Sequence, residues 1–214
     1  MAPGTAPVDD RRSGPVRPVP PAPSGGPHPP VPCRTVIPAD PDPVRHVVLL
    51  GPMGAGKTTV GAALARRLGR PLVDNDVELE SRAGRSAARI AAESGLDALH
   101  VLEADELRHA LRRRPAAVVT AAASVVDRPD TPALLAGHVV VWLDAPAEVL
   151  EHRTAGSTHR PALAPQGVGS AAALAEGRRP RFAALADVRV DATAGGPDDV
   201  AAAIVTRLAA VRPH

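Results

Sequence analysis

One glycine-rich segment constrains this chain more than any other feature of its sequence. Gly51 to Thr58 reads GPMGAGKT, which matches G-x-x-x-x-G-K-[ST] at every required position. The apolar run HVVLL (46–50) before it is typical of a buried parallel strand, and TTVGAALARRL (58–68) after it has helical spacing. In such a strand–loop–helix unit, backbone N–H groups and the positive end of the helix face phosphate oxygens. The sequence therefore predicts a nucleoside-triphosphate site.

Lysine usage singles out the same loop. Of the 25 basic residues 24 are arginine, and the only lysine in the chain is Lys57. Its compact ammonium group can bridge the β- and γ-phosphate oxygens of ATP, while the Thr58 hydroxyl can ligate Mg²⁺. We therefore assign a catalytic role to Lys57. The nucleotide-binding residues expected from the loop are Gly51, Gly54, Ala55, Gly56, Lys57, Thr58 and Thr59.

Short apolar strands alternate with helical segments along the rest of the chain. Strands are expected at 46–50, 71–74, 116–121, 138–145 and 187–192. Helices are expected at 58–68, 77–84, 87–94, 96–114, 131–137, 147–153, 172–186 and 198–212. This alternation predicts a three-layer α/β/α P-loop NTPase fold, in which a five-stranded parallel sheet has the strand 46–50 at its centre.

The first 45 residues have a different composition. They hold 14 of the 25 prolines and almost no apolar periodicity. Such a segment reads as a disordered, partly polyproline-II tail. We therefore expect a tail at 1–45 and a P-loop domain at 46–214.

Composition also argues against several classes of protein. The net charge is only +2 and aromatic residues make up 1% of the chain, which disfavours a nucleic-acid platform. The single cysteine, Cys33, cannot form an internal disulfide, and no apolar run approaches the ~18 residues of a membrane span. We expect a cytoplasmic monomer that acts on a small molecule, with neither nucleic acid nor membrane as a partner.

The residues after the second predicted strand carry a resemblance. Asp74-Asn75-Asp76 is followed by Val77-Glu78-Leu79-Glu80 and then by Gly84-Arg85-Ser86. This spacing resembles that of the shikimate kinases, which are P-loop kinases of the nucleoside-monophosphate-kinase type. The likeness continues at Arg153, at Arg160-Pro161 and at AGHVVVWLDAPAEVL, and covers about residues 46–212.

The resemblance and the chemistry of the residues imply the same roles. Asp74, at the end of a strand that we expect beside the phosphate-loop strand, would reach the Mg²⁺ shell. Asp76 faces the same way and would accept the proton of a substrate hydroxyl or orient it; the alternative is that Asp76 caps the following helix. Arg153 and Arg160 would close over the phosphates, with Arg160 catalytic and in contact with substrate; the alternative is two solvated arginines. The family packs a residue against adenine where Pro197 lies.

Three positions of the acceptor pocket depart from the family pattern. The family usually carries a carboxylate-binding arginine where His100 stands, and three glycines where Ala121, Ala122 and Ala123 stand. A second carboxylate-binding arginine is replaced by Ala183, with Arg178, Arg179 and Arg181 close by in sequence. His100 and the three alanines are the candidate substrate residues that accompany Asp76 and Arg160; His100 could also be an ordinary polar helix position.

Three functions remain open at this point. The chain could phosphorylate the 3-hydroxyl of shikimate with a tolerant pocket, or phosphorylate a different polyol or cyclitol by the same mechanism. It could also be a non-catalytic, regulatory ATP-binding protein. The complete set of phosphoryl-transfer residues favours a kinase.

Overall fold

The computed structural model describes residues 44–155, 171–193 and 195–211. Five strands form one parallel sheet in the order β2-β3-β1-β4-β5. The strands are β1 (Val47–Leu50), β2 (Leu72–Asp74), β3 (Val118–Thr120), β4 (Val139–Asp144) and β5 (Val188–Asp191). The predicted parallel sheet with β1 at its centre is therefore confirmed.

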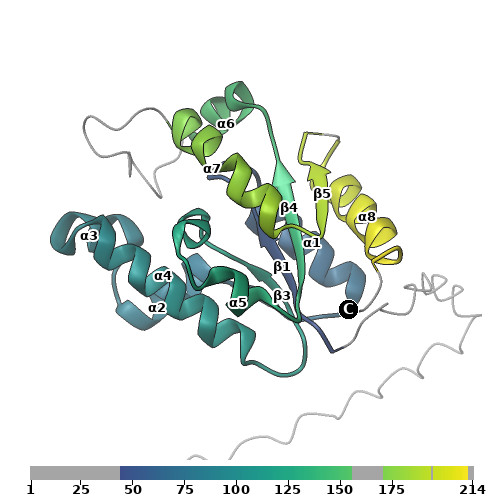
Figure 1. Ribbon diagram of the computed structural model, residues 1–214, viewed down its shortest axis with the longest axis horizontal. Coiled ribbons are helices and arrows are strands. Elements are labelled where there is room, and N and C mark those ends of the chain that lie inside the picture. The colour runs from purple at the N-terminus through teal and green to yellow at the C-terminus, as the bar shows by residue number, and fades with distance from the viewer. Residues whose placement is uncertain (1–43, 156–170, 194, 212–214) are drawn as a thin grey trace, which may run out of the picture. The chain divides into compact units, whose positions relative to one another are not determined.

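Helices connect the strands and cover both faces of the sheet (Figure 1). They are α1 (Lys57–Leu68), α2 (Asn75–Ala83), α3 (Ala87–Ser94), α4 (Leu96–Leu111), α5 (Thr131–Leu135), α6 (Ala147–Thr154), α7 (Ala171–Leu185) and α8 (Pro197–Leu208). A 3₁₀ helix, η1 (Ala123–Asp127), follows β3. None of these described helices is long and apolar enough to cross a lipid bilayer.

Alternating side chains of the strands divide the core into two layers. Val47 and Leu49 of β1 pack into the layer covered by α1 and α8. Val48 and Leu50 pack into the opposite layer, which is covered by α4, α5, η1 and α7. A smaller apolar cluster lies among α2, α3 and α4. The sheet is therefore buried on both faces, as an all-parallel sheet requires.

The end of one predicted helix and the place of one predicted strand in the sheet were wrong. The helix predicted over 96–114 ends at Leu111, because Pro115 disfavours helical backbone in the residue before it and lacks the N–H a helix needs. The strand that ends at Asp74 does not lie beside β1; β3 lies between them. A short apolar strand carries no signal for its neighbour in the sheet, so this order could not be read from the sequence.

A buried histidine lies at the opposite end of the sheet from the phosphate loop. His46 has no exposed surface, and its Nδ1 atom accepts a hydrogen bond from the Ala117 N–H at 3.0 Å. The ring of His138 meets it edge-on, with centroids 5.0 Å apart. Burial lowers the pKa of His46, and the nearby charge of Arg114 lowers it further. Burial likewise lowers the pKa of His138.

We expect the free energy of unfolding to fall as the pH falls from 7.5 to 5.5. In the unfolded chain the two histidines take up protons below a pH of about 6.5, whereas in the folded chain their lowered pKa values delay this uptake. Their contribution to stability is therefore present in full above that pH and is lost as the pH falls. Each such histidine contributes a slope of at most about 1.4 kcal/mol per pH unit. Urea titrations of His46→Asn should show a shallower slope, because asparagine keeps an acceptor near the Ala117 N–H without titrating. The matched control is His109→Asn, at an exposed position of α4. Equal slopes in His46→Asn and wild type would contradict the assignment.

Candidate active site

The phosphate loop runs from the end of β1 to the start of α1. A Cβ atom at Gly51 would lie 2.6 Å from the backbone oxygen of Leu143, so only glycine fits there. Gly56 is the N-cap of α1 with φ of 87°, a left-handed conformation that glycine adopts without strain. No side chain caps α1 and its first turn holds no acidic residue. Its first backbone N–H groups and the positive end of its dipole therefore remain for an anion.

Lys57 lies in the mouth of this loop. Its Nζ atom donates to the backbone oxygens of Gly51 at 2.9 Å and of Pro52 at 3.0 Å. The loop thus holds its ammonium group where incoming phosphate oxygens would meet it. The catalytic role of Lys57 stays a prediction from the sequence.

Thr58 and Asp74 meet across the sheet despite the strand between them. The Thr58 hydroxyl donates to Asp74 Oδ2 at 2.7 Å, and Asp74 is only 7% exposed. A hydroxyl and a carboxylate oxygen side by side are the ligands that Mg²⁺ prefers, so the residues present fit that ion. The two residues can meet because α1 packs against both β3 and β2, and Thr58 lies in the first turn of α1.

The Asp74 side chain also binds the backbone of the next helix, which carries Asp76. Its Oδ1 atom accepts hydrogen bonds from the backbone N–H groups of Asp76 at 3.0 Å and Val77 at 3.4 Å. Asp74 is therefore the N-cap of α2, and the alternative that Asp76 is the cap was wrong. Asp76 lies half-buried in the first turn of α2. Its carboxylate is not needed for capping and stays a candidate for the substrate hydroxyl.

The residues expected on the acceptor side lie on or next to α2, α4 and η1. His100 is half-buried on α4, and Glu103, one turn further, is only 1% exposed. The Glu103 carboxylate accepts a hydrogen bond from the Ser124 hydroxyl of η1. Asn75 of α2 donates its side-chain N–H to the Glu103 backbone oxygen at 3.2 Å. These bonds hold the three elements together around one buried polar cluster.

The sequence predictions missed that cluster. Ala121 and Ala122 are buried between β3 and η1, and the half-buried Ala123 begins η1, one residue before Ser124 of the cluster. Neither Glu103 nor Ser124 was assigned a role from the sequence. The signal was available: a glutamate at a helix position that periodicity places among buried residues must have a partner.

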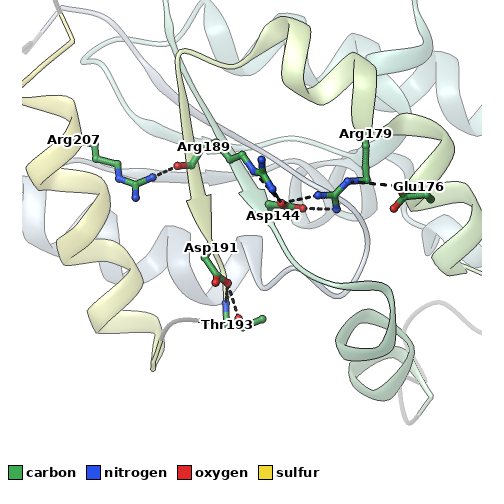
Figure 2. Close-up of polar contacts among 7 residues, drawn as sticks. All are labelled: Asp144, Glu176, Arg179, Arg189, Asp191, Thr193 and Arg207. Carbon is green, nitrogen blue, oxygen red and sulfur yellow. Dashed lines mark hydrogen bonds and ion pairs between the residues drawn. The ribbon is translucent and has the colours of Figure 1, made fainter.

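The three arginines of α7 that lie close to Ala183 in sequence are all bound to carboxylates of the protein. Arg178 Nε donates to Asp127 at 2.8 Å, and Arg181 Nη1 lies 3.3 Å from the same carboxylate. Arg179 turns to Asp144 instead, as Figure 2 shows. Ala183 is exposed. Arg178 and Arg181, five and two residues from Ala183, point in other directions around the helix, whereas Arg179, four residues away, shares the face of Ala183 but is bound to Asp144.

Two of the residues expected at the nucleotide, Arg153 and Pro197, lie on α6 and α8. Arg153 of α6 donates to the backbone oxygens of Gly54 at 3.3 Å and of Ala192 at 3.3 Å. It therefore bridges the phosphate loop and the segment that leads from β5 to Pro197, the exposed first residue of α8. Arg160, the second arginine expected over the phosphates, lies outside the described residues.

Comparison with known proteins decides between the P-loop families. Residues 53–209 match the family model of shikimate kinase. A shikimate kinase of Symbiobacterium thermophilum is 39% identical over 166 residues, covering 76% of this chain and 95% of that relative. The chain belongs to the shikimate kinase family.

Two further relatives agree with this membership. The shikimate kinase of Mycobacterium tuberculosis (strain ATCC 25177 / H37Ra) is 39% identical over 167 residues, covering 78% of this chain and 94% of that relative. The structure of the Acinetobacter baumannii shikimate kinase in complex with shikimate superposes with a TM-score of 0.70 at 27% identity, over 78% of this chain and 94% of that one. As a member of this family, the protein is an ATP-dependent kinase that phosphorylates a hydroxyl group of a small molecule.

Proposed function

We propose that this kinase transfers the γ-phosphoryl group of ATP to a hydroxyl group of shikimate. The observation that carries the proposal is the contact between Thr58 and Asp74, with Lys57 one residue before and Asp76 two residues after. This hydrogen bond brings together the two candidate metal ligands, the candidate phosphate-binding cation and the candidate base. The relatives named above supply shikimate as the first acceptor to test.

The residues divide the reaction between them. Lys57 and the backbone of the phosphate loop would bind the β- and γ-phosphates, and Thr58 and Asp74 would hold Mg²⁺, which neutralises phosphate charge. Asp76 would accept the proton of the acceptor hydroxyl as its oxygen bonds to the γ-phosphorus. The bond from that phosphorus to the bridging oxygen breaks, and ADP leaves with the electron pair.

Two arginines and a proline complete the proposed nucleotide site. Arg153 would neutralise charge on the bound nucleotide, since it already lies against the phosphate loop. Arg160 would do the same for the transferring group and contact the acceptor, as the resemblance implies. Pro197 would pack against the adenine. We also propose that the kinase works as a cytoplasmic monomer.

A second acceptor class is favoured by a specific observation. The positions of the two carboxylate-binding arginines hold His100 and an exposed Ala183, while the guanidinium groups of α7 are bound to Asp127 and Asp144. Two bidentate arginine contacts to a carboxylate are worth several kcal/mol, roughly 1.5–3 for each charged hydrogen bond. A polyol or cyclitol without a carboxylate would lose nothing in this pocket. Initial rates with shikimate and with a panel of neutral polyols and cyclitols distinguish the two.

Restoring one pocket arginine should improve shikimate binding only modestly. We expect His100→Arg to lower the Michaelis constant for shikimate about three- to tenfold, or roughly 0.6–1.4 kcal/mol, because Ala183 still leaves half of the clamp missing. His109→Arg adds the same charge at an exposed position of α4 and should leave that constant unchanged. A micromolar Michaelis constant in the unmodified protein would instead show that the departures do not weaken shikimate binding.

A further inference from the structure

Helix α7 is anchored to two carboxylates on opposite sides. Arg179 binds Asp144 through two parallel hydrogen bonds, Nη1 to Oδ1 at 2.7 Å and Nη2 to Oδ2 at 2.9 Å (Figure 2). Arg178, the preceding residue, binds Asp127 together with Arg181. Asp144 is the last residue of β4, and Asp127 is the last residue of η1. Helix α7 therefore connects the end of β4 to the end of η1.

The Asp144 carboxylate is buried and is shared by two arginines. Asp144 is 8% exposed and also accepts a hydrogen bond from Arg189 Nε of β5 at 2.9 Å (Figure 2). The guanidinium carbons of Arg179 and Arg189 lie 5.3 Å and 4.9 Å from the centre of the Trp142 ring. Trp142 in turn stacks on Phe182 of α7. Bidentate charged hydrogen bonds together with cation–π contacts fix geometry more tightly than a single surface ion pair does.

This anchor adjoins the phosphate loop. The residue before Asp144 is Leu143, whose backbone oxygen approaches Gly51 so closely that no Cβ atom fits between them. Pro52 of the loop lines the same small cavity as Trp142 and Arg179. A shift of α7 at Asp144 is therefore a shift relative to the loop that would hold the phosphates.

The Asp127 anchor adjoins the acceptor side. Asp127 ends the 3₁₀ helix that begins at Ala123 and carries Ser124, the partner of Glu103. The same helix α7 thus contacts the donor side of the site at one carboxylate and the acceptor side at the other.

We propose that α7 sets the spacing between the phosphate loop and the acceptor loop, and that Arg179 and Asp144 are positioning residues for phosphoryl transfer. The inference rests on the proposed function, because it takes η1 as part of the acceptor site. Arg179 acts through the helix, by keeping the acceptor hydroxyl in line with the γ-phosphorus. A displacement of about 1 Å at a reacting centre can cost on the order of a hundredfold in rate.

The test is a kinetic comparison of Arg179→Met with wild type. Methionine keeps an apolar stem over Trp142 but removes both hydrogen bonds to Asp144. We expect kcat to fall about ten- to a hundredfold and the KM for the acceptor to rise, while the Kd for ATP, titrated separately, stays within about twofold. Arg179→Lys, which keeps the charge and one donor, should recover part of the loss. All rates are measured well below the melting temperature and divided by the fraction of protein that binds ATP.

Arg207→Met is the matched control. Arg207 of α8 lies near the same edge of the sheet, but the bond shown for it in Figure 2 is to the backbone oxygen of Arg189. We expect its kcat and acceptor KM to equal those of wild type. If Arg179→Met melts at a lower temperature yet keeps both constants, the bridge is only structural and the proposal is overturned. A wild-type protein that phosphorylates no acceptor would instead contradict the proposed function, so the two failures are distinguishable.

Discussion

Replacing Lys57 with alanine should lower phosphoryl transfer at least about a thousandfold. In the proposed mechanism the ammonium group is the cation that the loop presents to the transferring phosphate, and it stabilises charge that develops in the transition state. The fold should survive, because the side chain is half-buried at a helix start and is no part of the apolar core. Turnover measured by ADP release, together with the melting temperature, checks both halves of this expectation.

Lys57→Arg is the informative companion variant. In a chain with 24 arginines, the loop alone carries lysine. A planar guanidinium is larger than an ammonium group and would not fit between the backbone oxygens of Gly51 and Pro52, which lie about 3 Å from the lysine nitrogen. We expect this variant to be nearly as slow as Lys57→Ala. Wild-type turnover in either variant would contradict a catalytic role for Lys57.

Replacing Asp76 with asparagine should lower kcat about a hundredfold or more with the true acceptor. Asparagine keeps the shape of the side chain but cannot accept the hydroxyl proton, and general-base catalysis contributes roughly 10²–10⁴ in rate. ATP binding should be nearly unchanged, since the proposed nucleotide contacts are made by other residues. Kinetics with a saturating acceptor and a separate ATP titration measure the two effects.

A charge change at another helix start provides the control for Asp76→Asn. Asp97 is an exposed residue in the first turn of α4, so Asp97→Asn removes the same favourable interaction with a helix dipole. We expect that variant to lose a little stability and no activity. If Asp76→Asn behaves in the same way, Asp76 is only a first-turn helix residue.

The nucleotide half of the site could be predicted from the sequence because its signals are local. Glycines, one lysine and a threonine within eight residues specify a loop whose backbone conformation they make possible. Thr58 and Asp74 were each expected at Mg²⁺, but their direct hydrogen bond was not predicted, and the expected place of β2 beside β1 was wrong, since β3 separates the two strands.

The acceptor half could not be predicted to the same depth because its contacts are made between distant segments. Glu103 and Ser124 are 21 residues apart, and Arg178 and Asp127 are 51 apart. Spacing along one helix shows on which side of it Arg178, Arg179 and Arg181 lie, but not which carboxylate each of them binds. The 3₁₀ helix over 123–127 is too short to give a periodic signal, so it was found only in the structure.

The position of Trp142 makes the protein its own optical probe. The chain contains one tryptophan and no tyrosine, so its near-ultraviolet fluorescence arises from a single indole. That indole lies under the Arg179 and Arg189 guanidinium groups and against Phe182. Emission from the unlabelled enzyme therefore reports on the position of α7, and of Arg189 on β5, relative to β4, in real time and during turnover.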